Sequence, residues 1–417
     1  MLWAHELRLL LRQRLTVAAL LLLAALTVAS LAAGLAEVSR QRAAIAAIPV
    51  AQAEDIGAIA DWIDKEKDAG SAAYYSFHST WDAPSPLAFA ALGMRDVSPF
   101  ILRVRALGLE AQIYDGDVFN PELALPGRFD FAFVLVFLAP LFVIALFHDL
   151  MSGEREAGRL RTLEALPRGG GALFRRRTLL RLALLWAVLA VPFGLAAIGS
   201  GVGAATTAVV LVLIAAYLLF WVGLSALVGR LRWSSVANAA TLAASWLVLV
   251  LVLPTLAHVA INQAVPVEQG AEIALAQRET VNGAWDIPRE STMQRFYASH
   301  PEWADSPPLG PDFHYKWYFA FHQNGDESVA DQVHAYRAGL ERRDGAARAI
   351  GWVLPSVGVQ ALLTRLARTD LTAQLAYQDR VRAFHAQLRR FYYGYLFRDR
   401  PFGKADFAAA PRFDEAS

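Results

Sequence analysis

The chain contains no cysteine and very little lysine. The lack of cysteine excludes disulfide bonds, thiolate metal sites and cysteine nucleophiles, although it does not identify a cellular compartment. A P-loop needs a lysine, followed by serine or threonine, at the end of a glycine-rich turn. None of the lysines has that setting; they are Lys65, Lys67, Lys316 and Lys404. A nucleotide site of this kind is therefore excluded.

Charge is also scarce, since only 18% of the 417 residues are charged while 56% are hydrophobic. This composition is too apolar for an ordinary soluble enzyme. The apolar residues are gathered in long uncharged runs, which alternate with stretches of normal polarity. That alternation is typical of a polytopic membrane protein with sizeable domains outside the bilayer.

Five uncharged runs are long enough, or nearly so, to cross a bilayer core of about 30 Å. Residues 1–36 predict a basic interfacial helix and a first span. A secretory signal peptide is the alternative, but the run exceeds an h-region of roughly 7–15 residues. The second span is expected in residues 129–148. Residues 179–229 predict a third and a fourth span joined at a glycine-rich hairpin, Gly199 to Gly203, and residues 233–261 predict the fifth.

Two longer segments, residues 37–128 and 262–417, are polar enough to fold in water. Both are expected to be mainly α-helical, with one or two short strands in residues 103–114. Residues 349–367 are the most apolar part of the second segment. Pro355 and the flanking arginines favour an amphipathic or core helix there over a sixth span.

The basic segments set the orientation. They are residues 1–14, 155–181 and 230–232, and five spans place all three on one side of the membrane. Short loops rich in arginine stay in the cytoplasm, so both large domains are predicted to be extracytoplasmic. The fold class predicted is an α-helical polytopic membrane protein with about five to six transmembrane helices and two mainly α, partly β, outer domains.

The cytoplasmic loop, residues 149–178, has the most informative pattern. Glu154 and Glu156 fall in a first helical turn, where the helix dipole favours carboxylates. Leu160, Leu163 and Leu166 mark one apolar face, and Pro167 ends the helix.

Arg155 and Arg159 are four residues apart in the same loop, so they repel each other within a helix. This suits an acidic surface on another protein. An interfacial helix lying on anionic lipid is the equally weighted alternative.

The other motifs are less informative about function than this loop. Gly199, Gly201 and Gly203 imitate a dinucleotide-binding loop, but they lie between two uncharged spans and are interpreted as a membrane hairpin. No H-E-x-x-H or G-x-S-x-G pattern occurs. Four histidines lie loosely spaced among aromatic residues, where core or surface roles are favoured over a metal site; they are His300, His314, His322 and His334.

The stretch DLMSGEREAGRL, from Asp149 to Leu160, followed by Leu166-Pro167, resembles the E-R-E-x-G-T-L…L-P signature of ABC-2 type permeases. Asn120-Pro121 before the second span, with two large outer segments, further resembles the NosY-like branch. The resemblance implies that this loop is the coupling helix that contacts an ATPase. Arg159 stands where the family usually has threonine. The coupling residues implied are Glu154, Arg155, Glu156, Gly158, Arg159, Leu160 and Leu163.

The resemblance implies the transmembrane subunit of an ABC exporter in a bacterial inner membrane, with its large domains on the periplasmic side. Its expected partners are an ABC ATPase subunit, a second permease (a copy or a sister subunit) and lipid, without nucleic acid. The chain itself is expected to be no enzyme and to bind no cofactor or metal, with ATP and magnesium on the ATPase. Such permeases usually have six spans, so the sixth is absent here or residues 349–367 replace it.

Two other function classes stay open. The spans could merely anchor a periplasmic binding or assembly protein, in which case a neutral linker could replace the cytoplasmic loop. A membrane enzyme using the histidines or acidic residues of the outer domains is the weakest alternative, because no catalytic spacing is visible.

Overall fold

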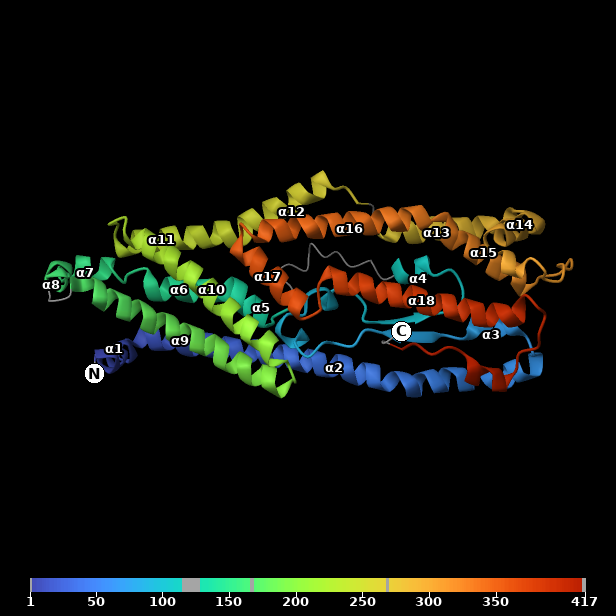
Figure 1. Ribbon diagram of the computed structural model, residues 1–417, viewed down its shortest axis with the longest axis horizontal. Helices are drawn as coiled ribbons and strands as arrows, with labels where there is room; N and C mark the ends of the chain where they lie inside the picture. The colour runs from blue at the N-terminus through green and yellow to red at the C-terminus, as the bar shows by residue number, and fades with distance from the viewer. Residues whose placement is uncertain (1, 115–127, 166–168, 268–269, 415–417) are drawn as a thin grey trace.

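The protein is elongated and almost entirely helical (Figure 1). The computed structural model describes residues 2–114, 128–165, 169–267 and 270–414. Within these residues five helices are long and apolar enough to cross a membrane, beginning at Arg14, Phe131, Gly171, Ala204 and Ser235. The predicted class of α-helical polytopic membrane protein is confirmed. We call these five helices the membrane bundle.

The first span does not end where its apolar run ends. After α1 (Leu2–Leu11), α2 runs without interruption from Arg14 to Glu66. The expected boundary after residue 36 therefore falls inside a helix. Two local interactions stabilise the helix beyond residue 36. Glu37 forms an ion pair with Arg40 and accepts a hydrogen bond of 2.9 Å from Gln41 Nε2. An alanine-rich stretch with high helix propensity follows.

The second span lies at the centre of the bundle and is the most buried of the five. It comprises α5 (Phe131–Phe133), the π-helical turn η4 (Val134–Leu138) and α6 (Ala139–Phe147). A π turn leaves backbone carbonyls without their usual partners, which is costly inside a membrane. Two donors from neighbouring spans satisfy them: Tyr217 Oη donates to Val136 O at 2.9 Å, and Trp246 Nε1 donates to Phe137 O at 3.0 Å.

The remaining spans surround the second one. They are α9 (Gly169–Gly199), α10 (Ala204–Gly229), and a fifth span built of α11 (Ser235–Trp246), the π-helical turn η5 (Leu247–Val252) and α12 (Leu253–Ala264). α9 ends at Gly199 and α10 begins at Ala204, so the turn between them falls at the glycines where the sequence predicts a hairpin. Gly201 takes a φ of +75° there, a conformation that glycine adopts without strain.

The two polar segments share one hydrophobic core instead of forming separate domains. We call them, with the end of α2 that packs on them, the distal domain. Phe296, Phe319 and Phe397 from the second segment pack in the same core as Leu107 and Ile63 from the first. Only this long-range packing unites the segments, so no local sequence pattern indicated it.

The distal domain is mostly helical. Its first segment contains α3 (Ala69–Tyr75), β1 (His78–Trp81), η1 (Ala88–Ala90), η2 (Gly93–Asp96), β2 (Ile101–Val104) and α4 (Glu110–Tyr114). Its second contains α13 (Gly270–Gly283), η6 (Ala284–Asp286), α14 (Arg289–Ser299), η7 (Pro301–Trp303), α15 (Tyr315–Ser328), α16 (Ala330–Gly351), α17 (Pro355–Leu366), α18 (Leu371–Leu396) and η8 (Lys404–Ala409). The strands β1 and β2 pair antiparallel, with His78 opposite Val104. The expectation of strand in residues 103–114 is right only at its start, because Asp326 caps the backbone amides of Leu109 and Glu110 and so begins α4.

Residues 349–367 do not form a sixth span. With 12 residues, α17 is only about 18 Å long, too short to cross a bilayer. Its apolar face nevertheless packs into the core of the membrane bundle through Val359, Leu363 and the adjoining Ala367. The helix is therefore amphipathic and lies against the spans at the end of the bundle that faces the distal domain.

Candidate functional site

The loop after the second span contains two short helices instead of the single one expected. They are α7 (Ser152–Glu156) and α8 (Leu160–Glu164). Gly158, with a φ of +72°, ends α7. Its amide donates to Arg155 O at 2.9 Å, and the amide of Arg159 donates to Glu154 O at 2.9 Å. This is a Schellman motif, which glycine favours because it alone enters the left-handed region without strain. Leu166 and Pro167, expected to complete the helix, lie outside the described residues, as do Asn120 and Pro121.

Glu154 is directed into the protein. Its Oε1 lies 2.7 Å from a guanidinium nitrogen of Arg177 on α9, and its Oε2 lies 2.7 Å from Nε of Arg159. Arg177 in turn contacts Glu6 on α1, with 3.2 Å between Nε and Oε2. The side chains of Glu154 and Glu6 are only 13% and 10% exposed. The carboxylate therefore attaches the loop to α1 and to the third span.

Glu156 attaches the same loop to the fifth span. Its Oε1 accepts a hydrogen bond of 2.7 Å from the backbone amide of Ser235, and its Oε2 accepts one of 3.0 Å from the Ser235 hydroxyl. Ser235 is the first residue of α11, so the carboxylate lies at the positive end of a helix dipole. Ser152 strengthens the joint through a hydroxyl contact of 2.8 Å to Ser235.

Arg155 and Arg159 face different partners, so the predicted repulsion between them is wrong. Arg155 donates to the carbonyl of Trp233, and Arg159 pairs with Glu154. The surface of the loop that remains free for another molecule is basic and partly apolar. Around α8 the described side chains of Arg159, Leu160, Arg161, Thr162 and Leu163 are exposed or half-exposed, and Glu156 is exposed as well.

The structure thus divides the predicted coupling residues into two groups. Glu154, Arg155 and Glu156 hold the loop to the bundle, while Arg159, Leu160 and Leu163 border its free surface. The pattern of the loop alone did not indicate the partners Glu6, Arg177 and Ser235, because they lie far away in the sequence. A signal existed in Ser234-Ser235, which suits a helix N-terminus, and Ser234 Oγ does accept from the amide of Ala237 at 3.2 Å.

Comparison with protein families decides the identity of the membrane part. A family model described as ABC-2 family transporter protein matches residues 1–302. This is more than half of the 417 residues, and it includes all five candidate spans and the loop. The chain belongs to the ABC-2 transporter family. A second family model, described as a domain of unknown function (DUF3526), matches residues 271–415 of this ABC-2 protein. Neither the curated proteins nor the solved structures yielded a match.

Family membership makes the chain a multi-pass membrane protein and the permease component of an ABC transporter. Such a transporter generally has an ABC ATPase partner, and the permease provides the membrane part.

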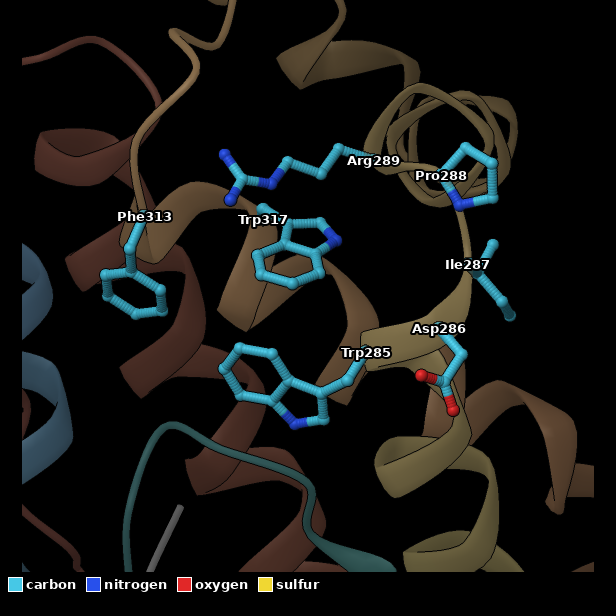
Figure 2. A pocket seen from close by; sticks show the side chains of 7 residues that line it. All are labelled: Trp285, Asp286, Ile287, Pro288, Arg289, Phe313 and Trp317. Atoms are coloured by element: carbon cyan, nitrogen blue, oxygen red, sulfur yellow. The ribbon is translucent and has the colours of Figure 1, made fainter.

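A second candidate site of this ABC-2 protein lies far from the loop, in the distal domain (Figure 2). It is an open hollow of about 530 Å³ between η6, the start of α14 and α15. Its lining is Trp285, Asp286, Ile287, Pro288, Arg289, Phe313 and Trp317.

The hollow combines flat apolar surfaces with a few polar groups. The guanidinium of Arg289 lies 4.8 Å from the ring centroid of Trp317 and donates to Pro311 O at 2.9 Å. Trp285 and Phe313 are half exposed. The indole nitrogen of Trp317 is buried without an acceptor among the described residues. Such a surface can bind a ligand that offers a flat face and a hydrogen-bond acceptor.

The histidines expected in this region do not converge. His300 lies 3.4 Å from Glu327, whereas His314 lies 3.8 Å from Asp399 in another part of the domain. His322 accepts from the amide of Gly108 at 3.3 Å, and His334 is exposed. Among the residues that the structure describes, no cluster of three or more potential ligands could hold a metal ion.

Several buried histidines of the distal domain instead make the stability of the fold depend on pH. It lowers the pKa of His78 to about 4 and, helped by nearby arginines, that of His322 to about 3. Burial also holds the pKa of His385 well below its usual value. These imidazoles are therefore neutral in the folded protein at pH 7.

We expect the protein to lose stability as the pH falls from 7 to 5. A histidine that titrates near 6.5 when unfolded and near 4 when folded stabilises the fold fully above pH 6.5. This contribution shrinks as the pH drops toward the folded pKa, by about 2 kcal/mol at pH 5 for His78 alone. The loss of stability can be measured by thermal unfolding of the full chain in lipid nanodiscs, with tryptophan fluorescence as the signal. His78→Gln should flatten the pH dependence, whereas the exposed control His334→Gln should not; an equal slope in both variants contradicts the assignment.

Proposed function

We propose that this chain is the permease subunit of an ATP-driven exporter in a bacterial inner membrane, and that residues 149–178 receive the movement of the ATPase. The observation that carries the proposal is the double attachment of this loop. Glu154 bonds to Arg177 and Glu156 bonds to Ser235, so the loop is fixed to two different spans. A displacement of α7 must therefore pull on both of them.

The docking surface and the transmitting contacts are separate in this proposal. The ATPase binds the free surface around Leu160, Arg161 and Leu163, where an acidic and apolar partner surface fits best. Glu154, which is largely covered, and Glu156, which is exposed but bonded to Ser235, pass the movement to the bundle. ATP and magnesium are bound by the ATPase, and this chain needs no cofactor of its own.

The topology follows the positive-inside rule, with the loop in the cytoplasm and the distal domain in the periplasm. This arrangement, with a large domain outside, supports the resemblance to the NosY-like branch. Lone apolar helices provide no polar path, so the route of the substrate is placed between this chain and a second permease, a copy or a sister subunit. Labelling of residues near 60 or 300 from the cytosolic side would show the orientation to be inverted.

Two variants separate docking from transmission in the complex reconstituted with its ATPase. Arg161→Glu should weaken ATPase binding about tenfold, or roughly 1.4 kcal/mol, because it reverses a charge on the docking surface. Glu156→Ala leaves α8 unchanged but removes both hydrogen bonds of the carboxylate to Ser235, so that only the hydroxyl contact of Ser152 still joins α7 to that residue. The ATPase should therefore still bind, while its activity responds less to the permease. Copurification and ATPase rates measure the two effects.

Arg12→Glu serves as the control, since Arg12 is an exposed arginine outside the loop. It should bind and stimulate the ATPase as the parent chain does. If the intact complex contains no ATPase, or if Glu156→Ala leaves the coupling intact, the proposal fails.

One observation favours a second candidate function. The aromatic hollow around Trp285 and Trp317 suits a binding role of the distal domain, with the spans as an anchor. That function predicts that a neutral linker in place of residues 152–164 preserves activity, whereas the permease function predicts its complete loss.

A further inference from the structure

The turn between α16 and α17 carries two apolar side chains that the protein leaves uncovered. Trp352 is 92% exposed, the largest value among the large hydrophobic residues that the structure describes, and the neighbouring Val353 is 78% exposed. Single exposed apolar residues are common on protein surfaces. A tryptophan almost entirely outside the protein at the tip of a helical hairpin is not explained by packing, however, so its environment has to come from outside this chain.

One hydrogen bond gives the depth of this turn along the bundle. The hydroxyl of Ser356, in the first turn of α17, donates to the carbonyl of Leu249 at 2.9 Å. Leu249 belongs to the π-helical turn η5 of the fifth span and lies 14 residues (249 − 235) after its first residue, Ser235. At 1.5 Å per residue this is about 21 Å along a membrane core of about 30 Å. Ser356 therefore lies within the half of the bilayer that is nearer the distal domain.

The character of this contact also fits a water-free environment. A π-helical turn leaves a backbone carbonyl without its helical donor, and lipid offers no replacement. The Ser356 hydroxyl supplies that donor. On the same helix, Val359 and Leu363 are buried in the core of the membrane bundle. The start of α17 is thus built into the spans, not merely placed near them.

The position of α16 beside the fifth span gives the same depth for the α16–α17 turn. α16 runs beside α12, and Figure 1 shows the two helices together with α17 folding back toward the bundle. Nε of Arg343 donates to Val265 O at 2.8 Å, immediately after the end of α12. From there α16 continues along the fifth span toward the membrane for two more turns and ends at Gly351. The turn after it, between Gly351 and Pro355, therefore lies near the level of Ser356 along the fifth span.

The side chains at the turn match the layers of a membrane. Tryptophan prefers the boundary between headgroups and acyl chains, where its ring is in apolar surroundings and its N–H near water. Arg348, one helical turn before Trp352, is 47% exposed and pairs with Asp344 at 3.1 Å. An arginine at this level can reach lipid phosphates.

We propose that the α16–α17 turn is inserted into the membrane leaflet nearest the distal domain, with Trp352 and Val353 in contact with lipid and Arg348 at the level of the phosphates. The distal domain is then held to the bilayer at a fourth place, besides its chain connections to α2, α5 and α12. The inference rests on the membrane bundle and not on ATPase coupling, so its test is independent of the proposed function.

The absence of cysteine makes the test direct, because each variant has one labelling site. Trp352→Cys in the full chain is labelled with the polarity-sensitive fluorophore NBD and placed in phosphatidylcholine nanodiscs, with or without lipids that carry a nitroxide quencher on the acyl chain. We expect blue-shifted emission and strong quenching by these lipids. Val248→Cys, 42% exposed in η5, provides the reference inside the membrane, and Trp285→Cys, 52% exposed in the distal hollow, provides the reference in water.

Emission and quenching equal to those of Trp285→Cys would overturn the proposal. A blue shift without quenching would also overturn it, because a protein surface would then cover the turn instead of lipid. Val353→Cys repeats the measurement at the neighbouring position, so that the result does not depend on the loss of one tryptophan.

Discussion

Replacing Asp326 with alanine should lower the free energy of unfolding by about 3–5 kcal/mol, because the change leaves a buried arginine without its counter-ion. Asp326 lies 2.7 Å from a guanidinium nitrogen of Arg389, and both side chains are nearly buried, at 12% and 10% exposure. Removing the carboxylate leaves the guanidinium charge in a low-dielectric core, with the carbonyl of Leu107 as a remaining acceptor at 2.8 Å.

The same substitution removes the cap of α4. Asp326 accepts from the amide of Leu109 at 2.8 Å and from that of Glu110 at 3.2 Å, and helix N-termini need such acceptors. Because Leu109 belongs to the first polar segment and Asp326 to the second, the carboxylate also joins the two halves of the distal domain. Asp326→Asn should cost less than Asp326→Ala, since an amide oxygen can still accept from the backbone.

The matched control is Asp379→Ala. Asp379 also pairs with an arginine, Arg337, through two hydrogen bonds, but its side chain is 47% exposed. An ion pair at the surface contributes about 0–1 kcal/mol. Thermal unfolding of both variants in nanodiscs compares them directly. Equal shifts in the two variants would show that burial of the Asp326 pair does not govern stability.

Replacing Gly34 with alanine should destabilise the protein by about 1–3 kcal/mol or more, as overpacking does in a rigid core. A Cβ at this position in α2 would lie 2.0 Å from the carbonyl oxygen of Phe89. Ala88, Phe89 and Ala90 of η1 are completely buried, so this backbone has no free direction in which to move. The helix and η1 would have to separate where α2 leaves the membrane bundle.

Gly57→Ala, in the same helix, should have the opposite sign. A Cβ at Gly57 meets nothing within 4 Å, and alanine exceeds glycine in helix propensity by up to about 1 kcal/mol. The two variants make the same chemical change in the same element, so a difference in melting temperature isolates the contact with Phe89. A melting temperature for Gly34→Ala at or above that of the parent chain would contradict the close approach.

Much of the fold follows from the sequence because lipid imposes simple requirements. The uncharged runs identified the five spans, and the glycines at 199–203 identified the hairpin, since both depend on local chemistry. The continuation of α2 past Glu37 was missed because the apolar pattern changes there, while helix propensity and side-chain pairs take over. The common core of the two polar segments depends on contacts between residues more than 150 positions apart, such as Leu109 with Asp326 and Leu107 with Arg389.

The position of the candidate loop in the chain follows from its sequence, whereas its contacts with the spans do not. The motif around Glu154 and Glu156 indicated the loop, and the structure puts these carboxylates beside α9 and α11. Their contacts depend on Arg177 and Ser235, which no spacing within the loop reveals. The break at Gly158 was foreseeable, because a glycine two residues after a short helix commonly ends it in the left-handed conformation.

The continuity of α2 gives the molecule a lever arm. A helix of 53 residues is about 80 Å long, and it reaches from the end of the bundle that carries the loop to the core of the distal domain. If the membrane-spanning half of α2 tilts, the end of the helix in the distal domain is displaced by a distance that increases with its separation from the pivot. Pro49 lacks the amide that an α-helix needs at this point, so any bending of the arm is concentrated there. We therefore expect a small rotation of α2 within the bilayer to give a larger displacement of its far end, unless the helix bends at Pro49.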